Sequence, residues 1–209
     1  MTNFLTNGPD NAPTLLLAHG SGAPMDTPFM NEVTDYVTAG GVRVVRFEFS
    51  FMAGRRITGK KPPPPKAEKL IAEFSDILKE VSGRDIFIGG KSLGGRVASM
   101  MAQSCFDEGK IAGLVCLGYP FHPPGKPDRL RTDHFAGFTC PGLICQGEND
   151  PFGKREEIEQ YDLPASLQFH WAPFGNHDLV PPKRSGLTGQ DNWQGVGAAV
   201  ADFMKSQAL

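Results

Sequence analysis

The stretch of residues 85–99 most constrains the fold of this chain, because a short apolar run, a glycine-rich turn and a helix-compatible segment follow one another directly. The apolar run 86–88 is typical of a buried strand. The turn reads Gly90-x-Ser92-x-Gly94, the pattern of a nucleophile elbow, in which a serine stands on a sharp strand-to-helix bend. Glycines permit the close backbone approach that such a bend requires. The stretch therefore predicts an exposed serine hydroxyl at the carboxyl end of a strand.

The same turn also resembles the end of a phosphate-binding loop, whose pattern is G-x-x-x-x-G-K-[ST]. That pattern requires a glycine five residues before Gly90, and the chain has Asp85 at this position. The turn is also too short to wrap phosphates with successive backbone N–H groups. We therefore expect no nucleotide to bind here.

Six short apolar segments alternate with helix-compatible segments along the chain. We predict strands over residues 14–18, 42–49, 86–88, 113–118, 143–146 and 167–171. We predict helices, each with apolar residues on one face, over residues 27–39, 67–81, 93–101 and 192–206. This alternation favours an α/β fold with a mostly parallel sheet of about six strands and helices on both faces.

Two segments are predicted to lack regular structure. Residues 1–13 are polar and turn-prone, and we interpret them as an approach segment. A long polar loop follows the second strand and runs through Arg55 and Arg56 to four successive prolines at 62–65. No further domain is recognisable between the strands, so we expect one domain over residues 1–209 without a large lid.

Composition narrows the classes of partner. The chain has 209 residues, of which 40% are hydrophobic and 21% charged, as is ordinary for a soluble globular protein. A formal net charge of -2 does not indicate the basic surface that binding to nucleic acid or an anionic membrane requires. No apolar run approaches the ~20 residues that span a bilayer. We therefore expect a small-molecule substrate as the partner, and the sequence does not predict an oligomeric state.

The cysteines and the N-terminus bear on metal sites and location. The four cysteines have no C-x-x-C spacing and no nearby histidines that would complete a zinc pattern. We accordingly expect neither a metal nor a cofactor. The first residues lack the basic region and the apolar core of a secretory signal. A reducing cytoplasm is the compartment that this pattern favours.

Three candidate catalytic residues, Ser92, Asp150 and His177, each lie just past the end of a predicted strand. The carboxyl ends of parallel strands meet at one edge of the sheet, where this architecture places its ligands. A serine hydroxyl needs a base within hydrogen-bond reach to act as a nucleophile. His177 can take that proton and return it to the leaving group, while Asp150 fixes the histidine tautomer and stabilises the imidazolium.

Other residues compete for these roles. Glu148 is a second acidic candidate, and Asp150 is preferred because the loop must leave the sheet before it can reach the histidine. Among the other histidines, His19 is interpreted as a structural residue of the loop after the first predicted strand, and His122 as a residue that lines the site.

An oxyanion hole requires two backbone donors. The N–H of Leu93, directly after the serine and at a helix start, is the first candidate. The second is expected in the loop after the first predicted strand, at Ser21 or at Gly22. Arg55 and Arg56 are predicted to lie on the same side of the sheet and to bind a carboxylate or phosphate of the substrate, unless they belong to a solvated loop.

The motifs quoted above, together with His19-Gly20-Ser21-Gly22, Gly147-Glu148-Asn149-Asp150 and Gly175-Asn176-His177, resemble the α/β-hydrolase superfamily. More narrowly, segments 118–126 and 130–134 resemble a small dienelactone-hydrolase-like branch that is related to testis-expressed protein 30 and to the third subunit of the NSL chromatin complex. The resemblance covers about residues 13–206. It implies a minimal α/β-hydrolase core with a Ser-Asp-His site at Ser92, Asp150 and His177. Dienelactone hydrolase itself uses a cysteine nucleophile, whereas this chain has serine at that position.

The combined reading is a metal-independent serine hydrolase that cleaves a small ester or thioester through an acyl-enzyme on Ser92. The alternative is a hydrolase-fold module that binds a partner or ligand without turnover, because a fold does not by itself determine a function. Lyase or haloperoxidase-like chemistry on the same residues is a third interpretation. The presence of all three catalytic residue types at strand ends favours the enzyme.

Overall fold

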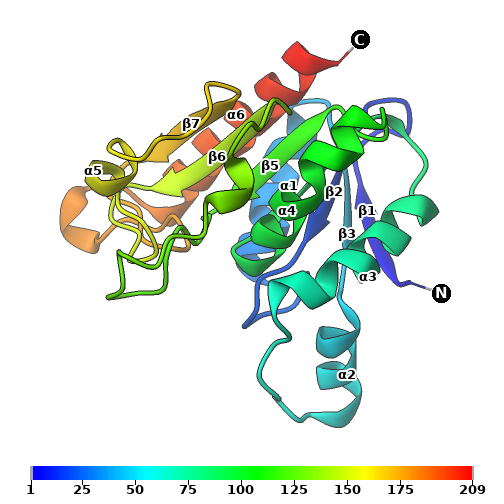
Figure 1. Cartoon of the computed structure of the whole chain (residues 1–209), viewed down its shortest axis with the longest axis horizontal. Helices are drawn as coiled ribbons and strands as arrows, with labels where there is room; N and C mark the ends of the chain where they lie inside the picture. The colour runs from blue at the N-terminus through cyan, green and yellow to red at the C-terminus, as the bar shows by residue number, and fades with distance from the viewer. Residues whose placement is uncertain (1, 209) are drawn as a thin grey trace.

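A seven-stranded sheet lies at the centre of the computed structural model, which describes residues 2–208 (Figure 1). The strands lie in the order β1-β3-β2-β4-β5-β6-β7, and every neighbouring pair is parallel except the edge strand β1, which runs antiparallel to β3. Their bounds are β1 Phe4–Asn7, β2 Pro13–Ala18, β3 Arg43–Phe47, β4 Arg84–Lys91, β5 Gly113–Leu117, β6 Gly142–Gly147 and β7 Leu167–Ala172. The predicted α/β class with a mostly parallel sheet is confirmed.

The extra strand is β1, which lies in the segment predicted as a turn-prone approach. It has four residues and pairs with β3 from Phe4 opposite Phe47 to Asn7 opposite Val44. Only two of its four residues are apolar, so its sequence lacks the alternation that would indicate a strand. Its conformation comes from the edge of β3, which offers unpaired backbone groups.

Four helices cover the two faces of the sheet. In Figure 1, α3 and α4 lie in front of the sheet, and α1 and α6 lie behind it. Each face has its own cluster of buried apolar side chains. The parallel strands are therefore covered on both sides, which explains why they read as continuous apolar runs. The bounds are α1 Pro28–Ala39, α3 Ala67–Glu80, α4 Leu93–Asp107 and α6 Gly189–Gln207.

The predicted loop around Arg55 and Arg56 is instead a helix, α2, at Ser50–Thr58. Met52 is buried, and the helix ends at Gly59 in the left-handed conformation. A nine-residue helix with one buried apolar residue and an internal glycine carries almost no periodic signal. Contacts from elsewhere in the chain support it, since the Ser50 N–H donates to Glu73 of α3.

In the described part of the chain, the remaining helical elements are short and do not form a lid. They are α5 Arg155–Ile158 and two 3-10 turns, η1 Asp133–Phe135 and η2 Lys183–Ser185. Within residues 2–208, no helix combines the length and the apolar character needed to cross a bilayer. The carboxyl ends of β4, β6 and β7 lie at the same edge of the parallel sheet, and the loops that follow them meet there.

Candidate active site

Ser92 occupies the bend between β4 and α4 with φ 51° and ψ -112°. A non-glycine residue in this region of backbone space is strained, and such strain is held in place by the surrounding structure. Neighbouring glycines make the bend possible. A Cβ added to Gly94 would lie 2.6 Å from the carbonyl oxygen of His19, and one added to Gly90 would overlap the carbonyl carbon of Gly94. Close approach of three backbone segments therefore requires both glycines of the motif.

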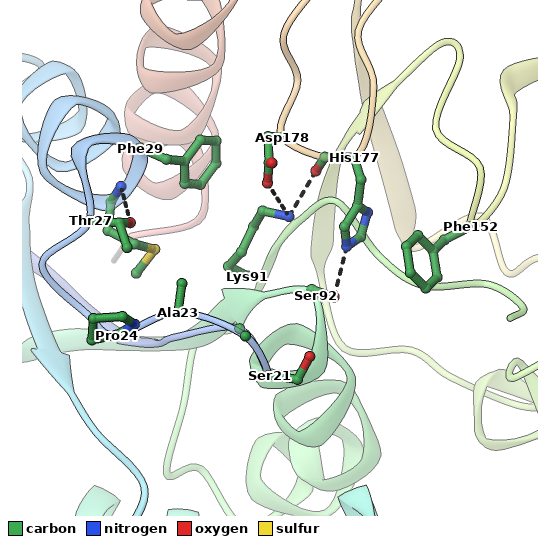
Figure 2. A pocket seen from close by; sticks show the side chains of 13 residues that line it. Ser21, Ala23, Pro24, Thr27, Phe29, Lys91, Ser92, Phe152, His177 and Asp178 are labelled. Atoms are coloured by element: carbon green, nitrogen blue, oxygen red, sulfur yellow. Dashed lines mark hydrogen bonds and ion pairs between the residues drawn. The ribbon is translucent and has the colours of Figure 1, made fainter. Parts of the chain in front are cut away.

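Ser92, His177 and Asp150 form a continuous chain of hydrogen bonds. The Oγ of Ser92 lies 2.8 Å from Nε2 of His177, and Nδ1 of His177 lies 2.8 Å from Oδ2 of Asp150. Figure 2 marks the contact between Ser92 and His177 with a dashed line. The three residues follow β4, β7 and β6, and the serine and the histidine are 85 positions apart in the sequence. The sheet brings them together because the carboxyl ends of its strands share one edge.

The carboxylate of Asp150 is fully buried, with an exposed fraction of 0%. Its Oδ1 accepts the N–H of Phe152 at 2.8 Å, and its Oδ2 accepts Nε2 of Gln146 at 3.0 Å in addition to the histidine. These donors satisfy a group that would be costly to bury without partners. Glu148, the other acidic candidate, pairs instead with Arg155 at 3.1 Å.

Lys91 ties the serine turn to the histidine loop. Its Nζ donates to the carbonyl oxygen of His177 at 2.8 Å and lies 3.3 Å from Oδ1 of Asp178. In Figure 2 the side chain extends between Phe29 and the histidine loop, and Nζ lies 5.5 Å from the centre of the Phe29 ring. Burial lowers the pKa of Lys91, and Asp178 partly opposes this shift. The residue next to the serine thus holds the backbone of the histidine.

The sequence offers no signal for this contact except the position of Lys91 beside the serine. Its partners follow a strand at the far side of the sheet, so only the fold brings them within reach.

The two predicted oxyanion donors lie beside Ser92. Leu93 is the first residue of α4, where a backbone N–H has no acceptor within the helix. Ser21 follows β2 and lines both cavities that Ser92 lines. The carbonyl oxygen of Ser21 accepts Nη1 of Arg55 at 2.9 Å, so its loop is held from α2.

His19 is a structural residue of the same loop. Its Nδ1 bonds the carbonyl oxygen of Gly20, and its Nε2 accepts the N–H of Phe49 at 3.2 Å. These two contacts require a neutral ring with the proton on Nδ1. Burial lowers the pKa of His19, in keeping with a neutral ring.

The predicted substrate-binding residues Arg55, Arg56 and His122 are engaged elsewhere, and none is among the described residues that line either cavity at Ser92. Arg56 pairs with Glu48 and Asp26, each at 2.6 Å. Besides Ser21, Arg55 donates to the carbonyl oxygen of Pro62 at 2.7 Å.

His122 is buried, with Nδ1 2.9 Å from the carbonyl oxygen of Pro123 and Nε2 3.4 Å from Glu157. The structure thus gives all three residues partners within the protein, and their contact with a substrate stays a prediction. The two arginines lie on the helix α2 and not on the solvated loop expected from the sequence. The helix directs them toward the carboxylates and carbonyl groups of neighbouring loops.

Two cavities meet at Ser92. One, of about 310 Å³, is bordered by Phe29, Lys91 and His177. The other is a groove of about 540 Å³ on the side of Leu93. Ser21, Ser92 and Phe152 line both, and the ring centre of Phe152 lies 4.2 Å from that of His177. A bound molecule that reaches Ser92 therefore has room for two substituents, one on each side of the hydroxyl.

Solved structures with the same architecture include known hydrolases. The dienelactone hydrolase of Anabaena variabilis is 16% identical with a TM-score of 0.71, over 100% of this chain and 93% of that chain. Est1E from Butyrivibrio proteoclasticus is 16% identical with a TM-score of 0.68, over 99% and 94%. The monoacylglycerol lipase of Paleococcus ferrophilus is 15% identical with a TM-score of 0.67, over 100% of each chain. At these identities the likeness shows the fold.

Residues 11–205 match the family described as alpha/beta hydrolase domain. The match spans every strand from β2 onward and includes the serine turn, both loops that carry Asp150 and His177, and most of α6. This protein belongs to the alpha/beta hydrolase domain family.

Proposed function

We propose that the protein is a serine hydrolase that cleaves a small ester or thioester through an acyl-enzyme on Ser92. The observation that carries this proposal is the unbroken contact from Ser92 Oγ to His177 Nε2 and from His177 Nδ1 to Asp150, each at 2.8 Å. Two cavities give a substrate access to the serine. The order serine, aspartate, histidine along the chain is that of the α/β-hydrolase fold.

The acylation step begins when Ser92 Oγ attacks the carbonyl carbon of the substrate. His177 Nε2 takes the hydroxyl proton, and Asp150 stabilises the resulting imidazolium through Nδ1. The N–H groups of Leu93 and Ser21 are proposed to stabilise the oxyanion of the tetrahedral intermediate. The bond between the carbonyl carbon and the leaving oxygen or sulfur then breaks, and His177 gives the proton to the leaving group.

The deacylation step repeats this chemistry with water. His177 takes a proton from a water molecule, whose oxygen attacks the acyl carbon, and then returns the proton to Ser92 Oγ as the acyl–serine bond breaks. The products are a carboxylic acid and an alcohol or thiol. Apart from the substrate and this water molecule, the groups that the two proposed steps use are side chains and backbone N–H groups of this chain.

We further propose that the protein belongs to the small dienelactone-hydrolase-like branch related to testis-expressed protein 30 and the third subunit of the NSL complex. The motif residues 118–126 and 130–134 support this assignment. Serine at position 92, where dienelactone hydrolase has cysteine, argues against dienelactone as the substrate.

Intact-mass analysis after treatment with a fluorophosphonate probe tests the proposal. The probe reacts with an activated serine, so no substrate has to be chosen. We expect one adduct on the wild type, none on Ser92→Ala, and strongly slowed labelling of His177→Ala. Ser104→Ala, which changes an exposed serine of the same helix α4, serves as the matched control and should label like the wild type. A folded wild type that takes no label would refute the activated serine and favour a module that binds without turnover.

A further inference from the structure

The groove on the Leu93 side of Ser92 carries more positive than negative charge. Three cationic side chains, Lys66, Arg96 and Arg131, line it together with a single carboxylate, Glu68. These four groups leave a net charge of +2, although the whole chain has a formal net charge of -2. The cavity on the other side of the serine has Lys91 and Asp178 in contact with each other, so its charges are paired.

Among residues 2–208, neither Lys66 nor Arg131 has a partner for its side-chain charge, and Arg131 is the half-buried one of the two. Its N–H donates to the carbonyl oxygen of Phe121 at 2.8 Å, and its own carbonyl oxygen accepts the hydroxyl of Tyr119 at 2.8 Å, so its backbone is held in place. Within residues 2–208, its guanidinium lies at hydrogen-bond or ion-pair distance from no acceptor. Burial lowers the pKa of Arg131 and the nearby charge of Arg96 lowers it further, whereas Tyr119 and Glu68 oppose this shift. Two guanidinium groups that repel each other make a favourable place for an anion.

Arg96 is only partly neutralised. It lies one helical turn after Ser92 on α4, so both residues are on the same face of the helix. Its Nη2 lies 3.2 Å from Glu68, whose side chain is 54% exposed, and an ion pair with so exposed a partner is weak. Its Nε is buried and has no hydrogen-bond partner among the described residues. A further acceptor can therefore bind without displacing a strong contact.

The two sides of Ser92 are assigned to different halves of the substrate by the proposed chemistry. His177 must protonate the leaving group, and it borders the cavity that contains Lys91. The leaving group is therefore directed to that side. The acyl group extends into the opposite groove, past Leu93 and toward Arg96 and Arg131.

We propose that this groove binds a carboxylate at the far end of the acyl group, so that the substrates are half-esters or half-thioesters of short dicarboxylic acids. This inference rests on the proposed serine hydrolase. Guanidinium groups pair with carboxylates through two parallel hydrogen bonds, which gives orientation as well as affinity. Attack by Ser92 releases the alcohol or thiol with the proton from His177, and water then releases the dicarboxylate.

Two esters with the same leaving group test the inference. The first is the mono-4-nitrophenyl ester of glutaric acid, and the second is its methyl ester, in which the far carboxylate is neutral. We expect the ratio of their kcat/KM values to favour the anionic ester by at least about tenfold, since hydrogen bonds to charged groups contribute about 1.5–3 kcal/mol. The corresponding esters of succinic and adipic acid locate the best length.

Variants of the groove make the test specific. Arg131→Gln should lower the ratio by about tenfold or more, whereas Arg129→Gln, an exposed arginine outside the lining of the groove, should leave it unchanged. Glu68→Gln should raise the ratio, because it removes the opposing charge from the groove. A gain of this kind does not arise from misfolding, so Glu68→Gln keeps the test decisive if Arg131→Gln is unstable.

The outcomes separate the two proposals. If the wild type, Arg131→Gln and Glu68→Gln have the same ratio of kcat/KM for the anionic ester to kcat/KM for the neutral ester, the anion-binding groove is overturned. The serine hydrolase would remain in place. Labelling of Ser92 without turnover of any of these esters would also overturn the groove. Absence of labelling would remove the serine hydrolase, on which the groove depends.

Discussion

Replacing Lys91 with methionine tests whether a single buried cation positions His177, the proposed catalytic base. The ammonium donates to the carbonyl oxygen of His177 at 2.8 Å, and the Lys91 side chain is only 9% exposed. Methionine is also unbranched and fills much of the same space against Phe29, so the change removes the charge and its hydrogen bonds with little loss of packing.

The magnitude follows from the two contacts of the ammonium. The buried hydrogen bond to the His177 carbonyl is charge-assisted and worth about 1.5–3 kcal/mol. The pair with Asp178 contributes little, because that carboxylate is 65% exposed. If this energy holds the histidine loop in its productive position, its loss lowers kcat/KM by roughly 10- to 150-fold.

The assay is the rate constant for labelling of Ser92 by a fluorophosphonate, measured at a temperature where both proteins are fully folded. Urea denaturation of the same samples reports any loss of global stability. Asp178→Asn is the matched control, and we expect it to change the labelling rate by less than about threefold. If the labelling rate constant of Lys91→Met lies within about twofold of the wild-type value, the positioning role is refuted.

Two further predictions concern residues around the site. Arg55→Met should lower kcat by about tenfold with little change in KM, because it frees the carbonyl oxygen of Ser21 and loosens a proposed oxyanion donor. Steady-state kinetics on a 4-nitrophenyl ester measures both constants, and an unchanged kcat would contradict this prediction. Burial and the charge of Arg96 lower the pKa of His134 to about 4 from 6.5. The unfolded chain therefore binds more protons than the folded protein between these values, so the free energy of unfolding should fall as pH falls from about 6.5 to about 4. Allowing for partial exposure of the ring, we expect a loss of roughly 1–2 kcal/mol. Urea denaturation across this range should show a smaller loss for His134→Gln, and equal losses would contradict the assignment.

The parts of the fold that sequence patterns predict are those with strong local signals. The six predicted strands and four long helices are present, because runs of buried apolar residues and helical apolar stripes are properties of neighbouring residues. The edge strand β1 and the helix α2 are absent from the prediction. Both are short and have few buried residues, so their conformation depends on tertiary contacts. The strand β1 pairs with β3, and the helix α2 is bonded to α3.

The candidate site also has parts that the sequence predicts and parts that it does not. Ser92, Asp150 and His177 were identifiable because each follows a strand, and the sheet topology then brings the strand ends together. The contacts that Arg55 and Arg56 make within the protein could not be predicted, for the opposite reason. An arginine in a sequence does not reveal which carboxylate or carbonyl group it will meet.

The sequence by itself therefore determined the architecture and the positions of the candidate catalytic side chains, since both follow from local periodicity and from motifs of a few residues. Only the tertiary structure decided which cations are neutralised and which remain available. Arg56 meets two carboxylates, Lys91 meets the loop of the histidine, and Arg131 meets none within residues 2–208. Electrostatic contacts depend on distances between groups that are remote along the chain, and packing alone sets those distances.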